Sequence, residues 1–116
     1  MIHIYGIKNC NTVKKALDWA TAQKIDFEFH DFKKEIPTQK QLKAWLKEVD
    51  LQVLVNRQGT TYKQLSDAEK LACEKITTAL PLLMEKPSMI KRPVWVKGDG
   101  STRVGFNEEE MADWFS

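Results

Sequence analysis

The alternation of apolar and polar residues changes period twice at the start of the chain. Residues 2–5 place apolar Ile2 and Ile4 between polar and aromatic neighbours, a pattern that predicts a strand. From about Asn11 the apolar residues recur on one helical face, and residues 26–32 then alternate phenylalanine with polar residues as a second strand. A strand, a helix and a strand over about 30 residues predict two parallel strands joined by a right-handed crossover.

The middle of the chain, residues 38–86, is predicted to be all-helical. Two capping-box patterns, Thr38 with Gln41 and Ser66 with Glu69, each indicate the start of a helix.

Two further segments of this region allow more than one interpretation. Residues 51–55 are apolar and short, so they fit either a strand or a helical turn. Thr77 or Thr78 is expected to cap another helix, with Pro81 tolerated in its first turn.

The end of the chain returns to a strand pattern. Residues 94–96 and 102–105 are predicted to form a hairpin around the Asp99-Gly100 turn. Asn107 and Glu110 form a third capping-box pattern, which predicts a short final helix.

The order of elements is β-α-β, a helical block, and β-β-α, which is the thioredoxin-like order with helices inserted between its halves. We therefore expect an α/β fold with a four-stranded mixed sheet, in a single domain 1–116 with a helical insertion at about 38–86. In such a fold we expect Pro93 to be the first residue of the third strand. A proline at this place in a thioredoxin-like fold characteristically follows a cis peptide bond and lies against the nucleophilic residue. A cis X–Pro bond is a minority state, and an ordinary proline at a strand start is the alternative.

Composition restricts the class of protein. The 116 residues suit one globular domain, and a net charge of +2 is too small to predict nucleic acid as a partner. No apolar run is long enough to predict a membrane span, and no secretory signal precedes the first strand. The chain has only two cysteines, which suits a cytoplasmic location. His3 and His30 have no metal-ligand spacing, so no metal site is predicted.

Cys10 is the leading candidate for a catalytic residue, because it lies where the first strand's loop meets a helix N-terminus. The unpaired backbone N–H groups and the helix dipole stabilise an anion there, so a cysteine at this place tends to ionise. Lys8 and Lys14 lie within a turn of Cys10 and favour the thiolate further. The alternative is a small buried residue, the commoner fate of a free cysteine, but the polar neighbours of Cys10 favour the reactive interpretation.

A second thiol is needed to complete a redox cycle. The position three residues after Cys10, where a redox motif has its second cysteine, is Val13. Glutathione is the simplest resolving thiol. Cys73 is the alternative, although its apolar neighbours favour a buried structural role.

Six more residues are candidates for binding glutathione or substrate. One of them is Pro93, which is expected to stand against the nucleophile. Arg92 offers a planar fork of donors to a carboxylate or an oxyanion, and would lower the pKa of a nearby thiol. Lys8 and Arg57 are weaker candidates, each about as consistent with plain surface charge. Asn11 and Thr12 would present backbone N–H groups, and Thr12 a hydroxyl, to an anion at the helix start.

Four segments resemble the arsenate reductase (ArsC)/Spx family, most of all its YffB-type branch of small proteins. They are IHIYGIKNCNTVKKAL, NRQGTTYKQL, PSMIKRPVWV and TRVGF, and they run in order over nearly the whole chain. The resemblance implies a thioredoxin-like fold with an inserted helical region, a nucleophilic Cys10 and an anion-contacting Arg92. Arsenate reductases of this kind carry three arginines around the cysteine. Here Asn56, followed by Arg57, and Phe106 stand at two of those positions.

These observations together predict a glutathione-dependent thiol oxidoreductase with a single nucleophilic cysteine. Cys10 would attack a disulfide, a glutathionylated thiol or an oxyanion, and glutathione would resolve the adduct. No bound cofactor and no membrane or nucleic-acid partner are expected; glutathione is the expected co-substrate, and glutaredoxin is a further partner implied by the resemblance. Two alternatives stay open: an arsenate reductase, weakened by the incomplete arginine set, and an Spx-like regulatory protein that contacts RNA polymerase, weakened by the absence of a cysteine pair.

Overall fold

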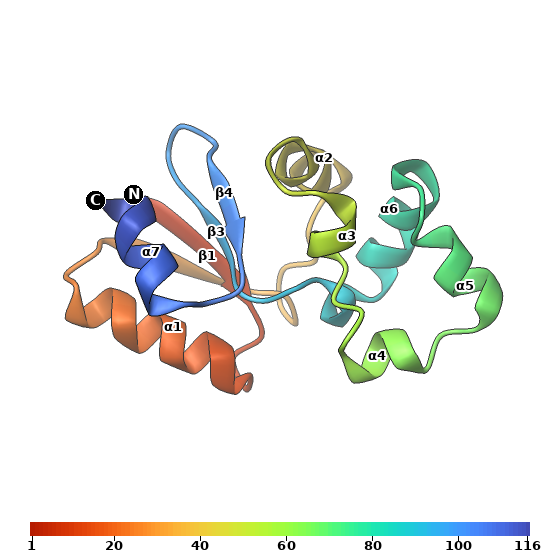
Figure 1. Cartoon of the computed structure of the whole chain (residues 1–116), viewed down its shortest axis with the longest axis horizontal. Coiled ribbons are helices and arrows are strands. Elements are labelled where there is room, and N and C mark those ends of the chain that lie inside the picture. The colour runs from red at the N-terminus through yellow and green to blue at the C-terminus, as the bar shows by residue number, and fades with distance from the viewer. The chain divides into compact units, whose positions relative to one another are not determined.

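The computed structural model describes all residues from 1 to 116, and they divide into two compact units. The first unit joins residues 1–31 to residues 92–116, and the second contains residues 32–91. In Figure 1 the first unit carries the red-orange and blue ends of the chain, and the second carries the yellow, green and cyan helices. The predicted helical insertion, residues 38–86, therefore falls within the second unit.

The first unit is a four-stranded mixed sheet with two helices. Its elements are β1 (Ile2–Gly6), α1 (Asn11–Ala22), β2 (Phe27–Asp31), β3 (Val94–Val96), β4 (Thr102–Val104) and α7 (Glu108–Phe115). The strand order is β2-β1-β3-β4, in which β1 and β2 are parallel and the other neighbours are antiparallel (Figure 1). This topology confirms the predicted thioredoxin-like α/β fold.

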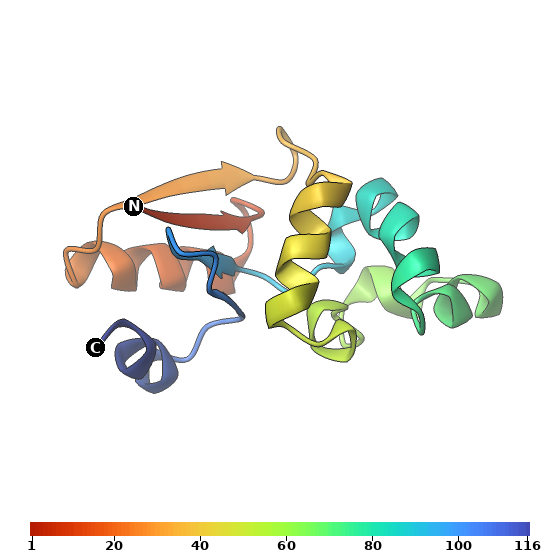
Figure 2. The ribbon, with the colours of Figure 1, turned by 90° about the horizontal axis from the view of Figure 1, so that it is seen from above.

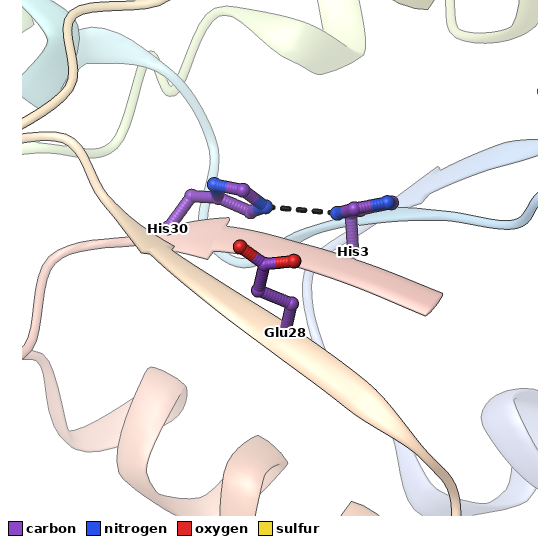
Figure 3. Close-up of side chains that lie close together, drawn as sticks. All are labelled: His3, Glu28 and His30. Atoms are coloured by element: carbon purple, nitrogen blue, oxygen red, sulfur yellow. Dashed lines mark hydrogen bonds between the residues drawn. The ribbon is translucent and has the colours of Figure 1, made fainter. Parts of the chain in front are cut away.

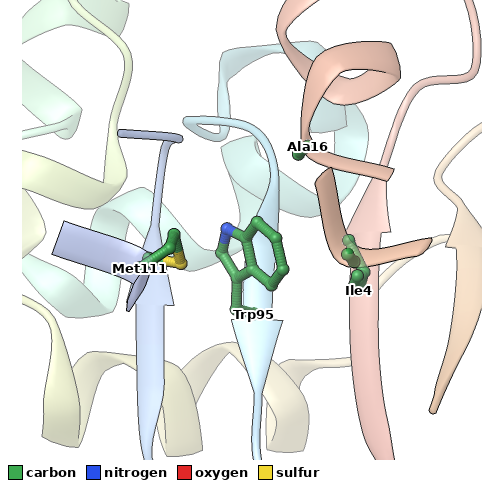
Figure 4. Packing of buried hydrophobic residues seen from close by; sticks show 5 residues of the cluster. Ile4, Ala16, Trp95 and Met111 are labelled. Carbon is green, nitrogen blue, oxygen red and sulfur yellow. The ribbon is translucent and has the colours of Figure 1, made fainter. Parts of the chain in front are cut away.

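Trp95 is the centre of the core of this unit. It pairs with Ile4 across β3 and β1, so both side chains point to the same face of the sheet. Ala16 from α1 and Met111 from α7 pack against them, and all four residues are buried (Figure 4). Both helices therefore cover one face of the sheet. In Figure 2, α1 runs alongside the β1–β2 pair.

The second unit is helical, as predicted. Its elements are α2 (Gln39–Glu48), α3 (Leu51–Leu54), α4 (Thr60–Lys63), α5 (Asp67–Ala72), α6 (Ile76–Glu85) and a 3-10 helix, η1 (Pro87–Met89). Residues 51–55, for which a strand and a helical turn were both open, contain the turn α3 followed by an isolated antiparallel bridge from Val55 to Ile90. The short helix α4 was not predicted, because TTYK carries no periodic apolar pattern.

Two of the three predicted capping boxes are complete in the structure, and the third is half-formed. Thr38 and Ser66 each accept the N3 backbone N–H and receive the reciprocal side-chain bond that completes the box. Asn107 caps α7 by accepting a hydrogen bond of 3.0 Å from the N–H of Glu110. Only this half of the third predicted box is formed.

The predicted start of α6 is wrong. The helix begins at Ile76, and the Thr78 hydroxyl donates hydrogen bonds to the carbonyl oxygens of Ala72 and Lys75, at 2.6 and 3.1 Å. Lys75 is the N-cap residue and Thr78 is the third residue of the helix, so neither Thr77 nor Thr78 stands at the cap position. Pro81 therefore lies inside the helix rather than in its first turn, where its missing N–H removes one helical hydrogen bond. None of the helices combines the length and the apolar composition required to cross a bilayer.

Candidate functional site

Strand pairing explains how Cys10 and Arg92 come together. Tyr5, near the end of β1, pairs with Val94, the first residue of the antiparallel strand β3. The carboxyl end of β1 therefore lies beside the amino end of β3. A short loop joins β1 to Cys10, and Arg92 lies just before β3. The fold therefore brings both residues to the same end of the two central strands.

The loop after β1 holds Cys10 at the start of α1. Gly6 is buried, and a Cβ atom there would lie 2.8 Å from Cγ2 of Val13, so the end of β1 approaches the first turn of α1 closely. The Cys10 N–H donates to the carbonyl of Ile7 at 3.1 Å, and the Lys14 N–H donates to the carbonyl of Cys10 at 3.0 Å. Cys10 is consequently the N-cap residue of α1, with extended backbone angles, and it lies at the helix start that the sequence predicted.

The pKa of the Cys10 thiol lies below its ordinary value. Partial burial raises this pKa, but the N–H of Val13, the guanidinium of Arg92 and the N–H of Thr12 together lower it by more. No hydrogen bond of full strength closes the cap, so the N–H groups act on the sulfur chiefly as oriented dipoles. Because the side chain is only half-buried, the favoured thiolate is open to attack a substrate.

The segment that carries Arg92 is anchored to the core. The Arg92–Pro93 peptide bond is cis, as predicted, and Pro93 is fully buried directly before β3. The carbonyl of Pro93 accepts the N–H of Gly105 at 2.9 Å, and the carbonyl of Gly105 accepts the indole N–H of Trp95 at 2.8 Å. Gly105 has φ of +81°, a conformation that favours glycine, so this pair of bonds depends on its identity.

The other candidate binding residues of the first unit, Asn11, Thr12 and Lys8, differ in how they act on the Cys10 thiol. Asn11 and Thr12 are the first two residues of α1, as expected, and both side chains are exposed. Thr12 acts on Cys10 through its backbone N–H. Lys8 is exposed in the loop before Cys10 and is not among the groups that lower the thiol's pKa.

Arg57 belongs to the second unit, where it forms its own contacts. Its Nη1 donates to the hydroxyl of Tyr62 at 2.9 Å and to Oε1 of Glu74 at 3.3 Å. Its Nε and Nη2 atoms are buried without a hydrogen-bond partner. Cys73 is fully buried, as the sequence favoured, and this burial raises the pKa of its thiol.

Sequence reasoning missed two contributors to the site. Val13 was noted only as the residue at the place of a second redox cysteine, although the hydrogen bond from its backbone N–H is the largest single cause that lowers the Cys10 pKa. An N-cap residue faces the N–H groups of the second and third helical positions, so this role follows once Cys10 is recognised as the cap. Gly105 carried no sequence signal beyond being a glycine.

Comparison with known proteins supports the resemblance seen in the sequence. Residues 5–114 match the ArsC family. A solved structure of a protein named YffB is 39% identical to this chain, covers all of both chains and superposes with a TM-score of 0.92. The solution structure of an arsenate reductase (ArsC) related protein from Brucella melitensis is 36% identical over 99% of this chain and 94% of its own, with a TM-score of 0.73.

Two curated proteins are also similar to this chain. An uncharacterized protein from Haemophilus influenzae is 42% identical over 116 residues, which is all of both chains. The Spx transcriptional regulators are more distant, and the Streptococcus pyogenes protein is 23% identical over all of this chain and 86% of its own length.

Proposed function

This chain belongs to the ArsC family, and on that premise we propose that it is a glutathione-dependent thiol oxidoreductase with Cys10 as its nucleophile. The supporting observation is the lowered pKa of a half-buried cysteine at a helix N-terminus beside Arg92. A thiolate in reach of solvent is the species that attacks disulfides.

The proposed reaction has two exchanges. The Cys10 thiolate attacks the glutathione sulfur of a mixed disulfide, forms a Cys10–glutathione disulfide, and releases the substrate as a thiolate that takes up a proton. The thiolate of a second glutathione then attacks the glutathione sulfur of that adduct. Oxidised glutathione leaves, and the Cys10 thiolate is restored. One glutathione is oxidised for each substrate thiol released, with the substrate disulfide as the oxidant.

An external thiol is required because this chain lacks a suitable internal one. Val13 occupies the place of a second redox cysteine, and Cys73 is fully buried. Glutathione carries two carboxylates, and the guanidinium of Arg92 at the sulfur provides the matching charge. Abundant reduced glutathione is a property of the cytoplasm, which is the compartment that we expect for this chain.

A coupled assay tests the proposal. A mixed disulfide of glutathione and a small thiol is supplied with reduced glutathione, and the oxidised glutathione formed is measured with glutathione reductase. We expect turnover with the wild-type protein, none with Cys10→Ser, and unchanged turnover with Cys73→Ala. A wild-type rate no higher than the reaction without protein, or equal rates for wild type and Cys10→Ser, would contradict the proposal.

Arsenate reduction is a second candidate, favoured by the name of the Brucella relative and by the anion-stabilising environment of Cys10. Only Arg92 matches the three arginines expected around the cysteine, so we rank it below disulfide exchange. Supplying arsenate with glutathione and glutaredoxin separates the two: disulfide turnover without arsenate reduction supports the first. A regulatory role like that of Spx predicts recovery of RNA polymerase in a pull-down, which the first proposal does not.

A further inference from the structure

The face of the sheet opposite Trp95 and Ile4 carries two histidines and a glutamate. Because side chains alternate along a strand, His3 on β1 points away from the core face that Ile4 occupies. The parallel register places His3 directly beside Glu28, and Tyr5 beside His30. Residues that are 27 apart in the chain are thus brought together, which explains why sequence spacing gave no metal signal.

The three side chains converge on one point. Nδ1 of His3 lies 2.8 Å from Nε2 of His30, and one ligand atom of each of the three residues lies within 4.8 Å of the others (Figure 3). Tyr5 stacks on the His30 ring, with centroids 4.5 Å apart and planes at 16°, which restricts how the imidazole can turn. Both histidines are half-buried and Glu28 is exposed.

We propose that His3, Glu28 and His30 bind a divalent transition-metal ion of the zinc type. The ligand atoms are Nδ1 of His3, Nε2 of His30 and a carboxylate oxygen of Glu28, with water completing a four-coordinate shell. Two imidazoles and a carboxylate are a donor set that suits Zn²⁺.

The distances permit such a site with small movements. Zn–N bonds of about 2.0–2.1 Å at a tetrahedral angle separate two nitrogens by about 3.3 Å. The two facing nitrogens must therefore part by about 0.5 Å from their present 2.8 Å. Glu28 is exposed, so its side chain is free to move inward as the third ligand. The hydrogen that bridges the two rings moves to the far nitrogen of its ring when the metal binds.

Histidine NMR gives a direct test, because the chain contains only these two histidines. Imidazole ¹H–¹⁵N spectra are recorded on the full-length protein before and after equimolar Zn²⁺. We expect the resonances of His3 Nδ1 and His30 Nε2 to shift together. Unchanged imidazole resonances, or a response from one ring only, would show that the pair is a hydrogen bond and not a metal site.

Variants then test the third ligand. Zn²⁺ affinity is measured by calorimetry in a Cys10→Ser background, which removes the accessible thiol as a competing ligand. Removing an outer-shell partner of a metal typically costs about 10–100-fold in affinity, and losing a ligand should cost no less, so we expect a loss of at least about tenfold for Glu28→Gln and a larger one for His30→Ala. Glu109→Gln, which removes an exposed carboxylate on α7, is the matched control and should bind as the parent does. Equal affinities for Glu28→Gln and Glu109→Gln would overturn the assignment. Because Glu28 is exposed, the Glu28→Gln variant should stay folded, as the dispersion of its backbone amide NMR spectrum will show. The test of the third ligand therefore stands even where His30→Ala does not fold.

Discussion

Replacing Arg92 with glutamine isolates the electrostatic part of Cys10 activation. The guanidinium acts on the thiol in two ways, by a hydrogen bond to the sulfur and by its charge, and both lower the thiol's pKa. Glutamine keeps a polar side chain but carries no charge. The neighbouring Pro93 and its hydrogen bond from Gly105 are left in place.

The expected effect has two opposing parts. A hydrogen bond to a charged group contributes about 1.5–3 kcal/mol, and we take about 1.5 kcal/mol because the sulfur is partly exposed and screened by water. That energy corresponds to about a tenfold smaller thiolate population at pH values below the thiol pKa of both proteins. A more basic thiolate is also a better nucleophile, with a Brønsted coefficient of about 0.4–0.5, which restores about threefold.

Alkylation by iodoacetamide across a pH series measures both parts. The Arg92→Gln variant should react about threefold more slowly than wild type at pH values below both thiol pKa values. On the alkaline plateau it should react about threefold faster, so the two profiles cross. Lys91→Gln removes one positive charge from the adjacent, exposed residue and should follow the wild-type profile. A rate lowered by the same factor at every pH, or identical effects of the two variants, would refute electrostatic activation by Arg92.

Four other outcomes follow from the structure. Gly6→Ala places a Cβ atom 2.8 Å from Cγ2 of buried Val13 and should lower the free energy of unfolding by about 1–3 kcal/mol. Urea denaturation measures this change, and an unchanged midpoint would contradict the close approach of Gly6 to Val13. Ser66→Ala removes the cap of α5 and should cost about 1 kcal/mol in the same assay without changing the alkylation rate of Cys10. Cys73 should be alkylated only after denaturation, as peptide mass spectrometry would reveal. The pKa of Cys10 is lower in the folded state than its unfolded value of about 8.5, so the free energy of unfolding of wild type, relative to Cys10→Ser, should rise as pH increases from the folded to the unfolded pKa. This gain should be lost as pH falls through the folded pKa. A difference between the two proteins that is the same at every pH would contradict the lowered pKa.

The parts of the fold that the sequence predicted are those with a local physical signal. Alternation in residues 2–5 and helical periodicity from Asn11 identified β1 and α1, and the change between them located Cys10. Capping boxes at Thr38 and Ser66 fixed two helix starts, since each pattern satisfies otherwise unpaired N–H groups.

The errors arise where a local pattern has two physical outcomes. Thr78 could cap a helix or bond a preceding carbonyl, and only the path of the chain after α5 decides that its hydroxyl contacts Ala72 and Lys75. Residues 51–55 supply both a helical turn and a bridge, which no single period describes.

The candidate site was partly predictable for the same reason. Cys10 and its N–H partners lie within four consecutive residues, so helix-start chemistry identified them. The contact with Arg92 depends on the β1–β3 register, and the meeting of His3 with His30 depends on the β1–β2 register. Register is a property of the folded sheet that no local window of the sequence contains.

Mass spectrometry after incubation with oxidised glutathione tests the central claim most directly. The account predicts a single glutathione adduct on Cys10, none on buried Cys73, and complete removal of the adduct by reduced glutathione. A native protein that stays unmodified, or that carries its adduct on Cys73 alone, would contradict it.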